Sequence, residues 1–429
     1  FRELRAELSK DGVEFVTETD TETVVLLTQK YMAEGLGPVD AATKTIARLH
    51  GAFALAFLFD GEDDLMIGAR KGAPLAVGYG DNEMYLGSDA IALSPMTDRV
   101  TYLEEGDRAV LTRTSVKIYD ANDAPVDRVV KKISLDTTRI DKAGHKHFMA
   151  KEIAEQPAVI GEALSRYLTA DGEIMLPDPG LDFTKIDRIT MVACGTAFYA
   201  CLTAKYWFEQ IARMPVEVDV ASEFRYREPP ISDRTMALFV SQSGETADTL
   251  AALRYCAGKA DLITSVVNVT ESSIARESNL ALPIHAGVEV GVASTKAFTC
   301  QLTVLFLMVL KAAVDRGAIT KEELADYVSG LRSMPSLINT ALEQNAALRD
   351  EAYKLSSARD VLFLGRGAMF PLALEGALKL KEISYIHAEA YASGELKHGP
   401  IALIDENVPV VVMAPNDMLF DKTVSNMQE

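Results

Sequence analysis

The sequence predicts an α/β protein in which two related domains with parallel sheets follow a smaller, sheet-rich α+β segment. Apolar runs over 188–194, 235–240 and 262–267 alternate with helix-like segments, and a similar strand–glycine–helix order returns at 360–367. Continuous apolar strands separated by helices are typical of a parallel sheet covered on both faces. Residues 1–135 instead hold short apolar runs bounded by Gly, Asp and Pro, as expected of strands joined by turns.

Size and composition fit a folded protein of more than one domain. The chain has 429 residues, 48% of them hydrophobic and 24% charged, which is too long for one ordinary domain and shows no low complexity. The formal net charge of −19 argues against nucleic acid or an anionic membrane as the main partner, because such a surface repels phosphates. A small anionic substrate stays open, since a local site can be positive on an acidic protein.

Cysteine spacing and hydropathy point to a reducing cytoplasmic location. The four cysteines follow neither a metal-site nor a disulfide pattern, so we expect no metal and no cofactor. The longest apolar run, 300–310, is too short to span a bilayer, and the N-terminus does not resemble a signal peptide. The chain begins at Phe1 without Met and ends at Glu429 inside a helix-like segment, so we expect residues beyond both limits.

The elements of the first part are expected in the following order. A buried strand over 51–59 ends at an Asp-Gly turn, and further short strands follow. Residues 136–160 are polar and basic at first and turn helical from Phe148, so they are interpreted as a linker into the next domain. The further strands are expected at 65–69, 83–87 and 108–112.

The second part alternates strands with helices and repeats this pattern once. Gly195 and Thr196 turn the first strand into a helix that runs through Trp207, and helices over 297–355 join the two halves. A helix near Pro371 follows the strand of the second half. The remaining elements are expected as a helix at 245–256 and strands at 360–364 and 408–413.

The Ser-Gln-Ser-Gly-Glu-Thr turn after the second strand is a candidate phosphate cradle. In an open parallel sheet, ligands bind beyond the carboxyl ends of strands, where loops enter helices. Ser241, Gln242, Ser243 and Thr246 offer side-chain donors, and Gly244 allows close backbone approach. The next helix adds free N–H groups that favour an anion. Helix capping explains a single Ser at such a place, whereas four donors around one glycine favour phosphate.

Two further segments hold polar residues near the start of a predicted helix. Thr196 lies on the equivalent turn after the first strand, where it either contacts the phosphate or caps the helix. The segment 291–297 precedes an apolar helix, and Ser294 or Thr295 is a natural N-cap there. From the residues alone, the capping role is favoured for this second segment.

Charged residues near the C-terminus form a candidate acid/base group. Lys379 and Glu382 are three residues apart and therefore share one face of a predicted helix. A carboxylate beside an ammonium group can move a proton next to a carbonyl, although charged residues more often form a solvated helix face. His398 precedes a Gly-Pro turn, where an imidazole can reach a ligand, but its position alone is not diagnostic.

Six motifs in order resemble one family, the glutamine–fructose-6-phosphate aminotransferases (isomerizing), also called glucosamine-6-phosphate synthases. Any one short motif could mislead, whereas six with the expected spacing over nearly the whole chain are specific. The motifs lie at 18–22, 147–157, 221–227, 241–249, 291–298 and 374–400.

The resemblance implies a domain organisation. Members of this family join an N-terminal-nucleophile glutaminase domain to two sugar-isomerase (SIS) domains, each an α/β/α sandwich. By this resemblance, 1–135 is the later part of the glutaminase (type 2 glutamine amidotransferase) domain and 136–160 is a linker. The first SIS domain covers 161–330, and an incomplete second one covers 331–429.

The resemblance also implies roles for single residues. Glu382 matches the acid/base that moves a proton between sugar carbons 1 and 2, and Lys379 matches its active-site companion. His398 matches the ring-opening histidine, which reaches the site of a neighbouring subunit and so implies a homodimer. Asp20 matches the carboxylate that holds the α-amino group of glutamine, and would otherwise be read as a turn former. Substrate-binding matches are Thr196, Ser241, Gln242, Ser243, Thr246, Val292 and Ser294.

Three departures from the family pattern stand out. The nucleophilic N-terminal cysteine is absent, and the C-terminal lysine that forms a Schiff base with the sugar would lie beyond Glu429. Ala197 stands where many members have a Ser that donates to the phosphate, a hydrogen bond worth about 1.5–3 kcal/mol. The first two departures are interpreted as truncation, and residues 1–429 alone are expected to bind ligand without turnover.

The implied activity is the glutamine-dependent conversion of fructose 6-phosphate to glucosamine 6-phosphate, the first step of hexosamine synthesis. Two alternatives stay open. Another SIS-type sugar-phosphate isomerase or deglycase would lack the glutaminase half. A non-enzymatic sugar-phosphate sensor would need the cradle but not Glu382, Lys379 and His398 together.

Overall fold

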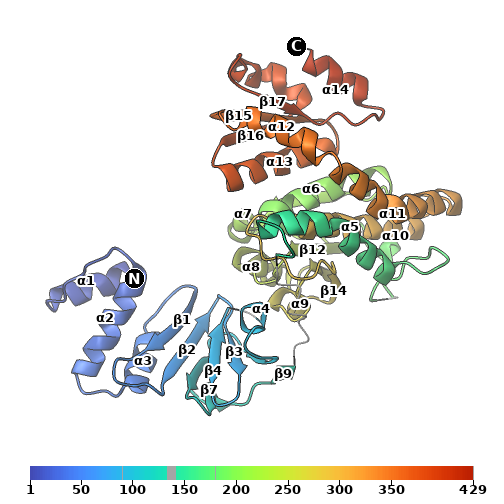
Figure 1. Cartoon of the computed structure of the whole chain (residues 1–429). Helices are drawn as coiled ribbons and strands as arrows, with labels where there is room; N and C mark the ends of the chain where they lie inside the picture. Colours follow the sequence, from blue (N-terminus) through green and yellow to red (C-terminus); the bar gives the residue numbers. More distant parts are fainter. Residues whose placement is uncertain (89, 133–141, 179, 429) are drawn as a thin grey trace. The chain divides into compact units, whose positions relative to one another are not determined.

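The computed structural model describes residues 1–88, 90–132, 142–178 and 180–428. The chain forms two compact units, Phe1–Asp141 and Lys142–Glu429 (Figure 1). Each unit has its own hydrophobic core. The linker predicted over 136–160 lies partly at 136–141, outside the described residues.

Helices open the first unit and pack around a small core of Leu8, Leu27, Tyr31 and Ala41. Asp20 is the first residue of a helix and not a turn residue, because Thr19 occupies the N-cap and accepts a hydrogen bond from the Glu22 N–H. The helices are α1 (Arg2–Lys10), α2 (Asp20–Ala33) and α3 (Pro38–Ile46).

Antiparallel strands and one short helix form the rest of the first unit, which confirms its α+β character. They form two sheets, with the orders β1-β2-β6-β7-β8 and β4-β3-β5-β9. A core cluster draws on both sheets, with Val77 from β3 and Leu111 from β6. The elements are β1 (Phe53–Leu58), β2 (Met66–Lys71), β3 (Ala76–Tyr79), β4 (Met84–Gly87), α4 (Ala90–Leu93), β5 (Arg99–Tyr102), β6 (Arg108–Leu111), β7 (Val116–Tyr119), β8 (Pro125–Val126) and β9 (Lys131–Lys132).

The prediction of a buried strand over 51–59 was wrong in its burial. β1 lies at the edge of its sheet, and Ala54, Ala56 and Leu58 are exposed on alternate positions. An edge strand with one covered face shows this period of two, which an uninterrupted apolar sequence conceals.

A parallel sheet of order β11-β10-β12-β13-β14 forms the centre of the second unit, as predicted. Apolar side chains alternate between its two faces, so both faces are buried: Met191 and Leu238 join one core cluster, whereas Val192 and Phe239 join the other. The strands are β10 (Arg188–Ala193), β11 (Val216–Val220), β12 (Thr235–Ser241), β13 (Leu262–Val267) and β14 (Leu280–Pro283).

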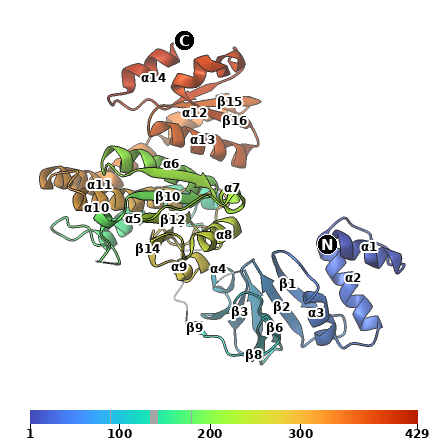
Figure 2. The ribbon, with the colours of Figure 1, turned by 180° about the vertical axis from the view of Figure 1, so that it is seen from behind.

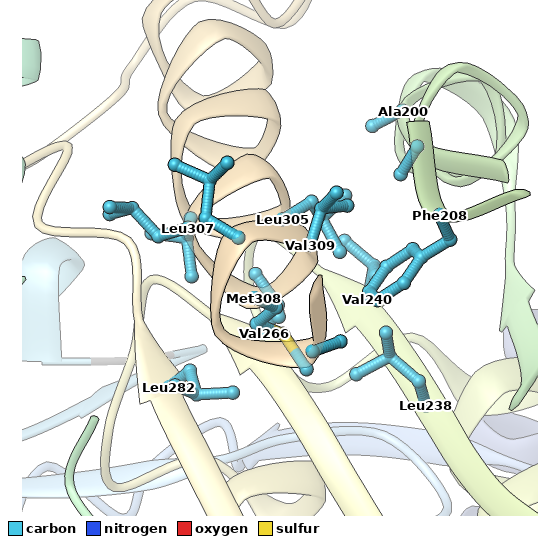
Figure 3. Packing of buried hydrophobic residues seen from close by; sticks show 14 of the residues in the cluster. Ala200, Phe208, Leu238, Val240, Val266, Leu282, Leu305, Leu307, Met308 and Val309 are labelled. Carbon is cyan, nitrogen blue, oxygen red and sulfur yellow. The ribbon is translucent and has the colours of Figure 1, made fainter. Parts of the chain in front are cut away.

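Helices cover both faces of this sheet and make a three-layer sandwich (Figure 2). α6 and α10 pack on one face, where Phe208 and Val309 meet Leu238 and Val240 (Figure 3). Helices α7, α8 and α9 pack on the other face. The helices are α5 (Phe148–Tyr167), α6 (Gly195–Gln210), α7 (Ala221–Arg227), α8 (Ala247–Cys256), α9 (Ser273–Glu277), α10 (Lys296–Asp315), α11 (Lys321–Leu342) and α12 (Asn345–Leu355).

The helix expected from Phe148 is confirmed as α5, which packs against α10 and α11. α10 is long and apolar enough to cross a membrane, with a mean hydropathy of 1.9, although the run 300–310 was judged too short. The helix continues past Lys311 to Asp315, and these two side chains form an i,i+4 ion pair at 2.5 Å. With 72% of its apolar stretch buried against the sheet and neighbouring helices, α10 is a core helix.

The last part of the chain repeats the strand–glycine–helix pattern. A small parallel sheet of order β16-β15-β17 carries α13 on one face, and α13 also packs against α6 (Figures 1 and 2). The elements are β15 (Asp360–Gly365), α13 (Met369–Ser384), β16 (His387–Ala392), the 3-10 helices η3 (Ser393–His398) and η4 (Pro400–Leu403), β17 (Val410–Val412) and α14 (Phe420–Met427).

Candidate active site

A cavity of about 240 Å³ opens at the carboxyl ends of β10 and β12, where the sequence predicted a ligand site. It brings together all seven substrate-binding candidates of the second unit. Six residues that were not proposed as ligands complete the described lining. The lining residues are Cys194, Thr196, Ala197, Val240, Ser241, Gln242, Ser243, Thr246, Glu289, Gly291, Val292, Ser294 and Gln301.

The cradle turn is held by its own hydroxyl groups. Ser241 ends β12, and its Oγ lies 3.0 Å from Thr246 Oγ1 and accepts a hydrogen bond from the Gly244 N–H at 3.0 Å. Ser243 Oγ accepts from the Glu245 N–H at 3.2 Å. Thr246 is the N-cap of α8, yet its side chain makes no capping hydrogen bond. Helix capping therefore does not explain the Thr246 hydroxyl, whereas the hydroxyls of Ser241 and Ser243 bind backbone N–H groups of the turn; all three residues line the cavity.

Gly244 is required by both its backbone conformation and its surroundings. Its φ is +66°, and a Cβ there would lie 1.9 Å from Ser272 Oγ. The turn is also tied to the first residues of α9, because the Gly244 carbonyl accepts from the Ile274 N–H and the Glu245 carboxylate accepts from the Ser273 N–H. These contacts hold the cradle turn in one conformation.

The segment before α10 forms the opposite wall, and its expected helix cap was wrong. Thr295 occupies the N-cap position without a capping side-chain bond. Instead Glu289 Oε1 accepts from the N–H groups of Thr295 and Ala297, at 2.9 and 3.1 Å, and Ser294 Oγ donates to Glu289 Oε2 at 2.8 Å. A carboxylate five or more residues away thus satisfies the helix N-terminus, which leaves Ser294 and the exposed Val292 beside the cavity.

Two of the remaining lining residues bear on ligand binding. Ala197 lies in the first turn of α6 and offers no side-chain donor, as expected from its residue type. Gln301, on the second turn of α10, is 2% exposed, and its Oε1 has no hydrogen-bond partner among the described residues. This oxygen is itself buried, so other atoms of Gln301 line the cavity.

A charged cluster on α13 adjoins the cavity through Thr196. Lys379 Nζ lies 2.5 Å from Glu382 Oε2 and 3.5 Å from Glu375 Oε1. Thr196 Oγ1 donates to Glu375 Oε1 at 3.0 Å, so Thr196 does not act as a helix cap. The predicted pair is therefore part of a triad, in which Glu375 and Lys379 are largely buried and Glu382 is more exposed. The alternative, that these charged residues only form a solvated helix face, does not fit this cluster.

Sequence reasoning missed Glu375, Glu289 and Gln301. The signal for Glu375 was present, because it precedes Lys379 by four residues and Glu382 by seven, which is one continuous helix stripe. Glu289 and Gln301 gave no such signal, since their roles depend on contacts across the fold.

Burial raises the pKa of the Glu375 carboxyl to about 7, while Lys379 and the Thr196 hydrogen bond oppose the rise. A carboxyl whose folded pKa lies above its unfolded value stabilises the fold less as pH rises from about 4.5 through 7. We therefore expect wild type to lose roughly 2–3 kcal/mol of unfolding free energy relative to Glu375→Gln between pH 5 and pH 8. Urea unfolding at both pH values measures the difference, and parallel pH profiles would contradict the expectation.

The other two candidates are placed differently. His398 is the last residue of η3 and is exposed, and it is not among the described residues that line the cavity. Asp20 lies in the first unit, exposed at the first turn of α2. Within the described part of the chain, no group of three His, Cys, Asp or Glu side chains could hold a metal ion.

Comparison with known proteins assigns both units. The glutamine amidotransferase domain family matches residues 1–95, and the SIS domain family matches 182–311 and 354–428. The glutamine–fructose-6-phosphate aminotransferase (isomerizing) of Brucella abortus biovar 1 is 57% identical over 430 residues, covering 100% of this chain and 71% of that protein. The chain belongs to the glutamine–fructose-6-phosphate aminotransferase (isomerizing) family. The family member from Bradyrhizobium diazoefficiens is 58% identical over 431 residues, with the same coverage.

Solved structures agree with this family assignment. The C-terminal domain of the glucosamine-fructose-6-phosphate aminotransferase from Francisella tularensis is 47% identical, with a TM-score of 0.65, covering 67% of this chain and 81% of that one. A phosphosugar isomerase structure from Silicibacter pomeroyi DSS-3 is 25% identical, with a TM-score of 0.53, covering 65% of this chain and 81% of that one. The aminotransferase family thus accounts for the glutamine amidotransferase match as well as for the SIS fold.

Proposed function

We propose that the protein converts fructose 6-phosphate and glutamine to glucosamine 6-phosphate, the first step of hexosamine and UDP-N-acetylglucosamine synthesis. Glutamine supplies the amino group, and the amidotransferase part releases it as ammonia. The observation that carries this proposal is a hydroxyl-lined anion cradle and a Glu–Lys–Glu cluster joined by Thr196, in a chain 57% identical to a named aminotransferase.

The cradle binds the phosphate of the sugar. Ser241, Gln242, Ser243 and Thr246 line the cavity directly in front of the α8 N-terminus, whose free N–H groups favour an anion. On a protein with a net charge of −19, such neutral donors give a local preference for phosphate. The sugar then lies along Val292 and Ser294 and extends toward Thr196. Ala197 removes one donor, which the four side chains and the helix N-terminus offset.

The α13 cluster carries out the isomerisation. Glu382 takes a proton from carbon 1 or 2 of the open-chain sugar and returns it to the other carbon, as a positioned carboxylate can do. Lys379 holds Glu382 at 2.5 Å and contacts Glu375 on its other side, so it fixes the carboxylate and balances the charge of the cluster. In the first unit, Asp20 offers its carboxylate to the α-amino group of glutamine.

A direct assay tests this function. The full-length protein is supplied with fructose 6-phosphate and glutamine, and glucosamine 6-phosphate is quantified by chromatography. We expect amino-sugar formation that requires both substrates. Absence of product above background would overturn the proposal, and full-rate turnover of the sugar phosphate without glutamine would favour a simple SIS isomerase.

The two alternatives are less well supported. An isomerase or deglycase does not account for the match of residues 1–95 to the glutamine amidotransferase domain. A sugar-phosphate sensor does not require the α13 cluster, in which two carboxylates and an ammonium group are held within 3.5 Å.

We also propose a homodimer in which His398 serves the site of the other copy. His398 is exposed outside the cavity lining, and apolar side chains of the adjoining η4 and the residue after it, Ile401, Leu403 and Ile404, are exposed too. Such a segment suits an isologous interface.

Complementation between variants tests the shared site. His398→Ala and Glu382→Gln are each expected to be inactive in the full-length protein. Subunits mixed by co-expression should regain about a quarter of wild-type activity, since half of the dimers are mixed and each has one intact site. Failure to regain activity, with mixed dimers present, would place His398 in its own subunit's site.

The domain limits and the location complete the proposal. We place the glutaminase part over 1–135 and the second SIS domain over 331–429. We place the first SIS domain over 161–330, and α5, which enters it from Phe148, packs against α10 and α11. A cytoplasmic location is supported by the free thiols of the four cysteines and by the burial of α10.

A further inference from the structure

Helix α5 carries buried charges that the proposed chemistry does not use. Glu152 and Lys151 are 2% and 7% exposed, and Lys296 at the start of α10 is 4% exposed. Buried charges are costly unless they are paired or hydrogen-bonded. α5 also lies outside residues 182–311 and 354–428, which match the SIS domain, so that match assigns no role to these charges.

The Glu152 carboxylate binds the backbone at the start of the cavity wall. Its Oε1 accepts hydrogen bonds from the N–H groups of Val290 and Gly291, at 2.6 and 3.1 Å, and its Oε2 lies 3.2 Å from the Gly291 nitrogen. Gly291 permits this approach, because a Cβ there would lie 2.5 Å from Glu152 Oε2. The carboxylate thus accepts hydrogen bonds from two consecutive backbone N–H groups that would otherwise need water.

The same helix also holds the other end of this wall. Glu155 lies one turn further along α5. Its carboxylate accepts a hydrogen bond from Lys296 Nζ at 2.7 Å and forms an ion pair with Lys151 Nζ at 3.4 Å. Between these two attachment points lie Val292 and Ser294, which line the cavity. The segment 290–296 is therefore fixed to α5 at both ends while its middle faces the ligand site.

We propose that Glu152 is a positioning residue for the sugar, acting from α5 through the peptide groups of Val290 and Gly291. This inference rests on the proposed function for the identity of the sugar. A loop that is already ordered loses less conformational freedom when the ligand binds, so the hydrogen bonds of Glu152 lower the free energy cost of sugar binding. The phosphate cradle belongs to a different loop and does not depend on Glu152.

Glu152→Gln tests this role with a change of similar size and shape. The amide keeps one acceptor oxygen, but its NH2 group faces an N–H of the loop and cannot accept from it. We expect KM for fructose 6-phosphate to rise about tenfold in the full-length enzyme, with kcat changed by less than about threefold. The inhibition constant of inorganic phosphate, which probes the cradle alone, should change by less than about twofold.

Glu162→Gln is the matched control. It makes the same substitution on the same helix, where Glu162 forms an exposed ion pair with Arg166. We expect its kinetic constants to match wild type, since exposed pairs contribute little. If wild type and this control both fail to make glucosamine 6-phosphate, the proposed function fails, and the sugar-positioning role fails with it.

The outcomes separate positioning from folding. An unchanged KM in Glu152→Gln overturns the proposal, and so does an equal loss of affinity for sugar and for inorganic phosphate, which would indicate general disruption. If Glu152→Gln does not fold, Glu155→Gln decides, because Glu155 is partly exposed and holds the other end of the segment. The same rise in KM without loss of phosphate affinity supports the proposal, and an unchanged KM overturns it.

Discussion

Gly244→Ala is expected to weaken fructose 6-phosphate binding about 100-fold or more and to lower the free energy of unfolding by about 2–4 kcal/mol. The added Cβ would lie 1.9 Å from Ser272 Oγ and 2.4 Å from Ser272 Cβ, and φ at this position is +66°. Ser272 cannot easily move away, because it is 2% exposed and caps α9. The turn must shift instead, which displaces the hydroxyls of Ser241 and Thr246 from the phosphate.

Gly258→Ala is the control for backbone strain. Gly258 follows α8 with a φ of +72°, and a Cβ there would have nothing within 4 Å. It should therefore cost about 1 kcal/mol of unfolding free energy and leave binding unchanged. Calorimetric titration with fructose 6-phosphate and urea unfolding measure both quantities. Equal binding losses in the two variants would show that the crowding at Ser272 is not what fixes the cradle.

The phosphate cradle shows which features can be predicted from the local sequence and which cannot. The order of donors around Gly244 and the preceding apolar run were enough to predict an anion site at a strand end. Ser272 was not predictable, because it lies 28 residues further along the chain and meets the glycine only in the folded sandwich. The same is true of Glu289, whose carboxylate replaces the cap expected from Ser294 or Thr295.

The strands show a similar difference: those at the centre of the sheet were predicted from the sequence, whereas two edge strands were missed. β10, β12 and β13 were predicted because strands covered on both faces are continuously apolar. β11 and β16 were missed, because they lie at sheet edges and carry charged residues such as Glu217 and Glu389. The alternation of valine with charged residues over Val216–Val220 was a signal for β11 that the sequence analysis did not use.

Glu382→Gln is expected to lower kcat for glucosamine 6-phosphate formation by about 1,000-fold, because the amide cannot accept the proton that moves between carbons 1 and 2. The affinity for fructose 6-phosphate should change by less than about threefold, since the cradle and Ser294 are untouched. The full-length protein is assayed for product, and ligand affinity is measured by calorimetry. Wild-type turnover in the variant would remove Glu382 from the chemistry.

Glu351→Gln on α12 is the matched control for this variant. Glu351 and Lys354 form the same i,i+3 pair as Lys379 and Glu382, with the order reversed and both side chains exposed. Its loss should cost only a few tenths of a kcal/mol in stability and nothing in turnover. A large loss of turnover in Glu382→Gln alone therefore reports proton transfer rather than the loss of a helix ion pair.

The Glu382 variant also separates an enzyme from a sensor. A sensor needs the phosphate cradle but no proton acceptor on α13, so it would bind the sugar equally well with Gln and would have no turnover to lose. An enzyme of this family should retain binding, lose amino-sugar formation and still hydrolyse glutamine, because Glu382 lies in the second unit and the amidotransferase match in the first. Loss of glutamine hydrolysis together with synthesis would instead show that the glutaminase reaction depends directly on this carboxylate.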